Sequence, residues 1–82
     1  MAKIKICGIM RKQDIDAVNA ALPDYIGFVF AKSRRQIDES RAKELKARLN
    51  PSIKAVGVFV NQDIDYIVKL CSSNVIDIIQ LR

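Results

Sequence analysis

Hydrophobic positions along the chain follow two different periods, and the changes of period divide it into seven segments. Four short runs rich in β-branched and aromatic residues predict strands at about 3–8, 25–31, 54–60 and 75–81. Between them, apolar residues recur every three or four positions, as one face of a helix requires. We therefore expect the order βαβαβαβ.

Each predicted helix carries one apolar stripe opposite a charged face. The stripe residues are Ile15, Val18 and Leu22 in the first helix, Ala42, Leu45 and Leu49 in the second, and Ile64, Ile67, Val68 and Cys71 in the third. Pro23 follows the first helix, and Asp38 and Asp63 are placed to cap the starts of the other two. We expect the stripes, Cys71 included, to pack on a sheet.

The last three predicted strands are nearly continuous in apolar character, which is typical of a parallel sheet. The segment 26–30 is echoed at 56–60, at the spacing of one βα unit. Such units build either an open, flavodoxin-like sheet or a closed eight-stranded barrel. No linker or low-complexity tract interrupts the chain, so we expect residues 1–82 to form a single structural unit.

Composition narrows the function classes. The chain has 82 residues, of which 50% are hydrophobic and 28% charged, as in an ordinary globular domain. Its apolar runs are far shorter than a membrane-spanning helix, and its start lacks the apolar stretch of a secretory signal, so we expect a cytoplasmic protein. The net charge of +5 comes from basic residues scattered among acidic ones, which does not favour a nucleic-acid partner. Two separated cysteines and no histidine argue against a zinc site or a disulfide framework.

Cys7 is the most distinctive candidate for chemistry, because sites in parallel α/β proteins form at the carboxyl ends of strands. Alternation along the first strand places Ile4 and Ile6 on one face, and Lys5 and Cys7 on the other. If the isoleucines meet the helices, Cys7 faces the site. A thiol acts as a base only in its thiolate form, which Lys5 and the start of the first helix would favour. A small packed hydrophobe is the competing interpretation of this cysteine.

The segment Lys5-Ile6-Cys7-Gly8-Ile9 resembles the opening strand of the phosphoribosylanthranilate isomerases. The other segments similar to this family, in the same order and spacing, are Tyr25–Phe30 with Lys32-Ser33-x-Arg35, Val56–Asn61, and Asp77-x-x-Gln80-Leu81. The departures are Met10, Arg34 and Arg82, where threonine, proline and histidine are common; the last leaves the role of Arg82 open. The resemblance spans the chain and implies the first half of a TIM (β/α)8 barrel.

The resemblance also implies an activity, the Amadori rearrangement of N-(5-phosphoribosyl)anthranilate to the 1-deoxyribulose phosphate in tryptophan biosynthesis, with no metal or organic cofactor. Cys7 would be the general base. Arg35 would bind the anthranilate carboxylate, and Gly8 and Gln80 would be further substrate-binding residues. Lys32 and Arg34 are expected to be surface charges, and Asp77 to be structural.

The family's acid and phosphate site belong to later strands, so we expect this chain alone to be inactive. The last predicted strand has no helix after it, for which a truncated barrel is the simplest explanation. Its uncovered surfaces favour a homodimer or larger assembly. Two alternatives remain: a small non-catalytic flavodoxin-like binding module, and another phosphosugar barrel enzyme.

Overall fold

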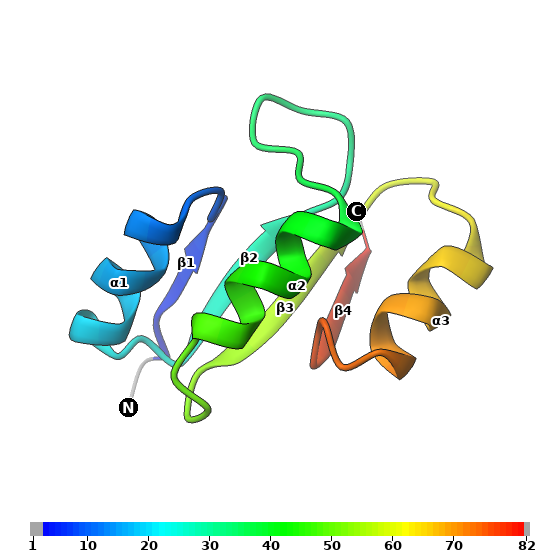
Figure 1. Cartoon of the computed structure of the whole chain (residues 1–82). Coiled ribbons are helices and arrows are strands. Elements are labelled where there is room, and N and C mark those ends of the chain that lie inside the picture. The colour runs from blue at the N-terminus through cyan, green and yellow to red at the C-terminus, as the bar shows by residue number, and fades with distance from the viewer. Residues whose placement is uncertain (1–2, 82) are drawn as a thin grey trace.

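Four strands alternate with three helices along the chain, as the sequence predicts (Figure 1). The structure, a computed structural model, describes residues 3–81. The elements are β1 (Lys5–Cys7), α1 (Lys12–Ala21), β2 (Tyr25–Val29), α2 (Glu39–Arg48), β3 (Lys54–Phe59), α3 (Ile64–Ser72) and β4 (Ile78–Leu81). Among these residues, no helix is long and apolar enough to cross a membrane.

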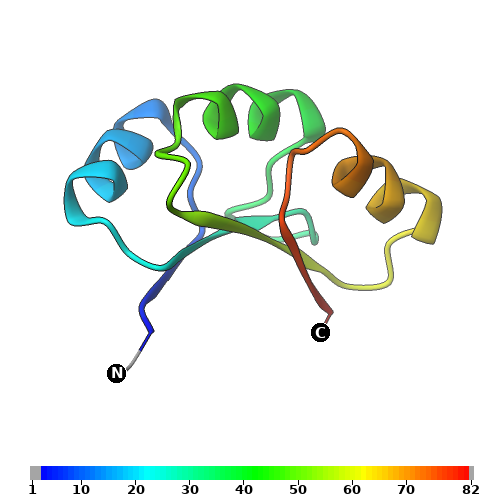
Figure 2. The ribbon, with the colours of Figure 1, turned by 90° about the horizontal axis from the view of Figure 1, so that it is seen from below.

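The strands form one parallel sheet in the order β1-β2-β3-β4, so each strand lies beside the next one in the chain. All three helices cover the same face of this sheet, and the opposite face is bare and curved (Figure 2). A flavodoxin-like sheet has a strand order that reverses and helices on both faces. That alternative is therefore wrong, and the arrangement is that of a barrel wall.

The core lies between the sheet and the helices. Phe28 and Phe59 are completely buried there, and the ring of Phe30 stacks on that of Phe59 with 5.2 Å between centroids. From the helices, Ile15 and Leu45 reach into the same core. Burying such side chains stabilises the fold by about 1.5–3 kcal/mol each, so this apolar layer holds the helices on the sheet.

The predicted stripe of α3 is correct for Ile67 alone. Ile67 and Leu70 are the buried residues of this helix, whereas Ile64 is 72% and Val68 55% exposed, and Cys71 is exposed as well. Both sides of α3 are apolar, so periodicity alone could not decide which one faces the sheet. The exposed side is the one that α2 and the sheet leave uncovered.

Leu22 also departs from its predicted place. It is 57% exposed and ends α1 as the C-cap in the left-handed conformation, with φ of 52°. The buried face of α1 is therefore confined to Ile15 and Val18. In α2, Ala42 and Leu45 are buried as the pattern predicts.

Asp77 fastens the start of β4, which begins at Ile78 although the apolar run begins at 75. Its Oδ2 atom accepts a hydrogen bond of 2.8 Å from the backbone N–H of Ala55 and pairs with Nζ of Lys46 at 2.7 Å. The Asp77 side chain thus accepts the hydrogen bond of a β3 amide that faces β4. The regular pairing of the two strands starts one residue later, at Val56 and Ile78. This is the structural role expected of Asp77.

Partial burial opposes the charged form of Asp77, but the hydrogen bonds from Ala55 and Lys46 outweigh it and hold the pKa of this carboxyl below its usual range. A lowered pKa in the folded state stabilises the protein above the unfolded pKa of about 4, and the effect is lost as the pH falls through the folded pKa.

We therefore predict that Asp77→Asn, which keeps the shape but removes the charge, lowers the free energy of unfolding by about 1 kcal/mol at neutral pH. The difference should shrink as the pH falls through the folded pKa of Asp77, because the wild-type side chain then becomes protonated as well. Urea unfolding at neutral and at acidic pH measures this. Asp16→Asn, which breaks an exposed ion pair with Arg48, is the control and should change stability much less. An equal loss at both pH values would contradict the electrostatic role of Asp77.

Candidate active site

A pocket of about 680 Å³ opens at the carboxyl ends of the strands, where the loops after β1, β2 and β3 meet. Its lining residues are Cys7, Gly8, Val29, Ala31, Lys32, Ser33, Arg34, Arg35, Val58 and Val60. Cys7, Val29 and Val58 come from strands, on the face away from the helices, and the remaining residues come from strand ends and loops. The pocket therefore lies at the carboxyl ends of the strands, where the sequence predicts a site.

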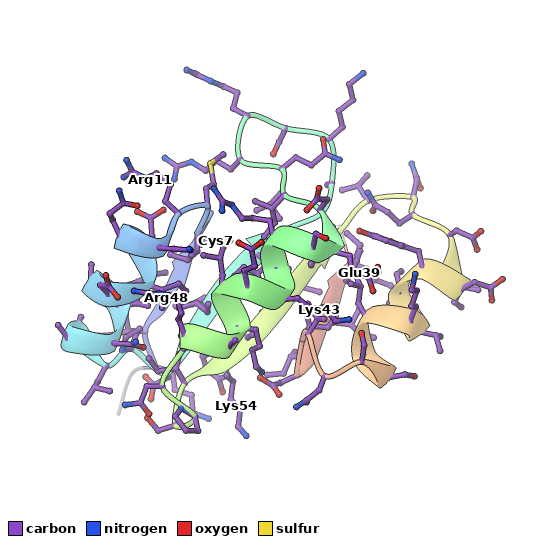
Figure 3. All side chains as sticks on the ribbon, viewed as in Figure 1. Cys7, Arg11, Glu39, Lys43, Arg48 and Lys54 are labelled. Carbon is purple, nitrogen blue, oxygen red and sulfur yellow. The ribbon has the colours of Figure 1, made fainter. Side chains whose placement is uncertain are left out.

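Cys7 is exposed at the end of β1, beside the loops (Figure 3). Its partner across the sheet is Gly27 of β2. A Cβ atom on Gly27 would lie only 2.5 Å from the Sγ atom of Cys7. The thiol therefore takes the space that a side chain at position 27 would fill, and this packing turns it toward the bare face of the sheet.

Arg35 reaches the same place from the loop after β2. Its Nη1 atom donates a hydrogen bond of 3.4 Å to the backbone oxygen of Gly8, directly after Cys7. Gly8 has φ of +81°, and a Cβ atom there would overlap the Cδ atom of Arg35. Gly8 thus has two reasons to be glycine: its left-handed backbone and the close approach of the arginine.

Two glutamines hold the loop that carries Arg35, and the sequence analysis did not identify them. The side-chain amides of Gln36 and Gln62 donate to the backbone oxygen of Phe30, at 3.3 and 3.0 Å. The backbone N–H of Ile37 also donates to Val29, at 2.9 Å. An amide side chain just beyond a strand end is a weak signal by itself, and only the folded loop shows what it contacts.

Gln80, predicted to bind substrate, lies on the bare face of the sheet but not in the lining of the pocket. Its Oε1 atom accepts a hydrogen bond from Nζ of Lys5. These residues belong to β1 and β4, the two outer strands, so the contact spans the whole bare face. Lys5 does lie on the same face as Cys7, as the alternation predicts.

The start of α1 is less close to Cys7 than the sequence suggests. The helix begins at Lys12, and the carboxylate of Asp14 accepts hydrogen bonds of 3.1 Å from the backbone N–H groups of Met10 and Arg11. The bond from Met10 is the main cause that holds the pKa of Asp14 below its usual range. Asp14 thus binds the amides of the two residues that precede α1.

Cys71 lies on α3, outside the lining of the pocket, and takes no part in the candidate site. Arg82 lies outside the described residues.

A parallel sheet in chain order, helices on one face, and a pocket at the carboxyl ends of the strands define the class: this is part of a βα-barrel of the kind that carries enzyme sites at this end. The family model described as N-(5'-phosphoribosyl)anthranilate (PRA) isomerase matches residues 4–82. The chain belongs to this family.

Individual relatives agree with the family assignment. The N-(5'-phosphoribosyl)anthranilate isomerases of Clostridium acetobutylicum and Endomicrobium trichonymphae are each 52% identical to it over 82 residues, which is 100% of this chain and 40% and 41% of theirs. The chain thus spans about two fifths of the length of these relatives.

Solved structures show the same arrangement. TrpF from Jonesia denitrificans superposes with a TM-score of 0.90 at 33% identity, covering 99% of this chain and 40% of that protein. A phosphoribosyl anthranilate isomerase in complex with reduced 1-(o-carboxyphenylamino)-1-deoxyribulose 5-phosphate superposes with a TM-score of 0.86 at 36% identity, covering 99% of this chain and 42% of that protein. The similarity confirms the TIM-barrel prediction.

Proposed function

We propose that residues 1–82 form the amino-terminal half of a phosphoribosylanthranilate isomerase barrel and supply two of its working groups, the base Cys7 and the carboxylate-binding Arg35. The main support is that Cys7, on β1, and Arg35, in the loop after β2, line one pocket in a chain of this family. The reaction is the Amadori rearrangement of N-(5-phosphoribosyl)anthranilate.

The rearrangement needs an acid and a base with opposite duties. The acid gives a proton to the ring oxygen as the bond from C1 to that oxygen breaks, which leaves a protonated C1=N imine. The Cys7 thiolate then removes the proton on C2. The electrons of that C–H bond form C1=C2, and the imine becomes an amine. The resulting enol takes a proton at C1 and loses the proton of its C2 hydroxyl, which gives the ketone. No atom or electron is needed from a co-reactant.

Arg35 suits the anthranilate carboxylate because a guanidinium can donate two parallel hydrogen bonds to one carboxylate. It carries five N–H donors, and its contact with the oxygen of Gly8 uses one of them. That contact places the guanidinium next to the residue that follows the base. An aromatic carboxylate held there would keep the attached sugar in reach of Cys7.

The other groups of the reaction, the acid and the phosphate-binding loops, come from the rest of the barrel in this proposal. Apolar side chains on the helix-facing side of the outer strands support it. Ile79 is 44% and Leu81 69% exposed on β4, and Ile6 of β1 is exposed as well. Further βα units would cover these residues, together with the exposed stripe of α3.

A chain of 82 residues by itself leaves those surfaces in water, and the outer strands also expose backbone groups that can pair with another sheet. A second copy of the chain is the partner that we propose for them. Such a pair would place two copies of Cys7 and Arg35 in one assembly and still supply no acid. Self-association therefore covers the apolar edges without restoring the reaction.

We predict that the purified 82-residue chain sediments as a dimer or larger species at micromolar concentration and shows no isomerase turnover. The positive control is a hybrid barrel, in which residues 1–82 are joined to the part of the Clostridium acetobutylicum relative that follows its matching segment. The hybrid should convert the substrate. A monomeric 82-residue chain would contradict the proposed self-association. An active one would contradict the proposal that the acid and the phosphate-binding loops come from the rest of the barrel. A folded but inactive hybrid would contradict the proposed function.

In the hybrid barrel, Cys7→Ala should lower kcat by about 10²- to 10⁴-fold, because it removes the group that takes the proton from C2. The circular dichroism spectrum should not change, since Cys7 is exposed and its replacement is smaller. Cys71→Ala is the matched control and should leave kcat unaltered. A Cys7→Ala variant within a few-fold of the unaltered hybrid would mean that the thiol only packs against Gly27.

A further inference from the structure

The pocket has a basic rim that the proposed chemistry does not use. Lys32 and Arg34 were expected to be surface charges, and both are exposed, yet both line the pocket beside Arg35. Arg34 and Arg35 also line a second hollow of about 460 Å³, together with Arg11. Basic side chains therefore surround the entrance from the loops after β1 and β2.

Acidic residues do not balance this charge. Asp14 is the one acidic residue that lines either hollow within residues 3–81, and its carboxylate accepts hydrogen bonds from the amides at the start of α1. Asp38 and Asp63, which follow β2 and β3, are likewise bound to the amides of Arg41 and Asp65 at the starts of α2 and α3. These three acids cap helices, and the other acids at this end, Glu39 and Asp65, lie in the first turns of α2 and α3 and line neither hollow. The cations, in contrast, line the pocket.

Like charges around a hollow attract an oppositely charged ligand from a distance and raise its rate of association. The loop that carries Lys32 and Arg34 is tied to the sheet by Gln36 and Gln62, so its charges stay at the entrance. Exposed charges contribute little to stability, because water and salt screen them. Changes at rim charges act mainly on the association rate and its salt dependence.

We infer that Lys32 and Arg34 are capture residues, which speed the encounter with a substrate that carries both a carboxylate and a phosphate but do not hold it during the reaction. The inference rests on the proposed function, because that function makes the substrate an anion. Lys32 and Arg34 affect the association rate alone. The dissociation rate and turnover depend on Arg35, Cys7 and the rest of the barrel.

The test is stopped-flow binding of reduced 1-(o-carboxyphenylamino)-1-deoxyribulose 5-phosphate to the hybrid barrel and to its Lys32→Gln, Arg34→Gln and double variants. The matched control is the double variant Lys43→Gln and Lys54→Gln. It removes the same charge away from both hollows: Lys43 lies midway along α2, and Lys54 begins β3, at the opposite end of the sheet from the pocket (Figure 3).

At low ionic strength, where screening extends over about 20 Å, the association rate of the Lys32/Arg34 double variant should fall by about 3- to 10-fold. The control should stay within about twofold of the unaltered hybrid, as should every dissociation rate. In about 0.5 M salt, where screening acts within about 4 Å, the association rates should converge.

Two results would overturn the inference. Association rates that are the same in the double variant and the control would make Lys32 and Arg34 ordinary surface charges. A faster dissociation rate with unchanged association would make them direct ligands. If the unaltered hybrid does not bind the compound at all, the proposed function fails, and the inference fails with it.

Discussion

The close approach of two side chains to two glycines is the constraint on which the site depends. The thiol of Cys7 occupies the space over Gly27, and the side chain of Arg35 lies against Gly8. A methyl group at either glycine would overlap an atom of the facing side chain, which would then have to shift. The Cys7 thiol and the Arg35 side chain thus occupy space that side chains at Gly27 and Gly8 would fill.

The sheet supplies the frame for this contact. The helices cover one face of the sheet, and successive residues of each strand point alternately to that face and to the bare face. On the helix side, Phe28 and Phe59 build the core. On the other side, Cys7 faces the pocket, and Lys5 and Gln80 bridge the bare face. The core and the candidate site therefore lie on opposite faces of the same four strands.

Local patterns predict the seven elements well, because the periods of strands and helices depend on residues that are near one another in the chain. The same alternation places Cys7 on the correct face of β1. Local pattern could not choose between a barrel and an open sheet, since both use the same βα unit. That choice depends on which strands are neighbours, and only the family resemblance favoured the barrel before the strand order was known.

The remaining differences also have physical causes. α3 has two apolar sides, and period alone does not say that Ile67 and Leu70 are the residues that pack. β4 starts late because a carboxylate, that of Asp77, takes the first amide of its neighbour. The place of Arg35 over Gly8 and the anchoring of its loop by Gln36 depend on a non-periodic turn. Patterns of hydrophobicity contain no information about such contacts.

We propose that Cys7 and Arg35 act on one bound substrate, and a crystal structure of the hybrid barrel with reduced 1-(o-carboxyphenylamino)-1-deoxyribulose 5-phosphate would show whether both reach it. The Arg35 guanidinium should lie about 2.7–2.9 Å from the carboxylate oxygens of the compound. Sγ of Cys7 should lie about 3–3.5 Å from C2 of the sugar chain, the carbon whose proton is removed in the reaction. A carboxylate bound by other residues, or a thiol turned away from C2, would contradict the proposal.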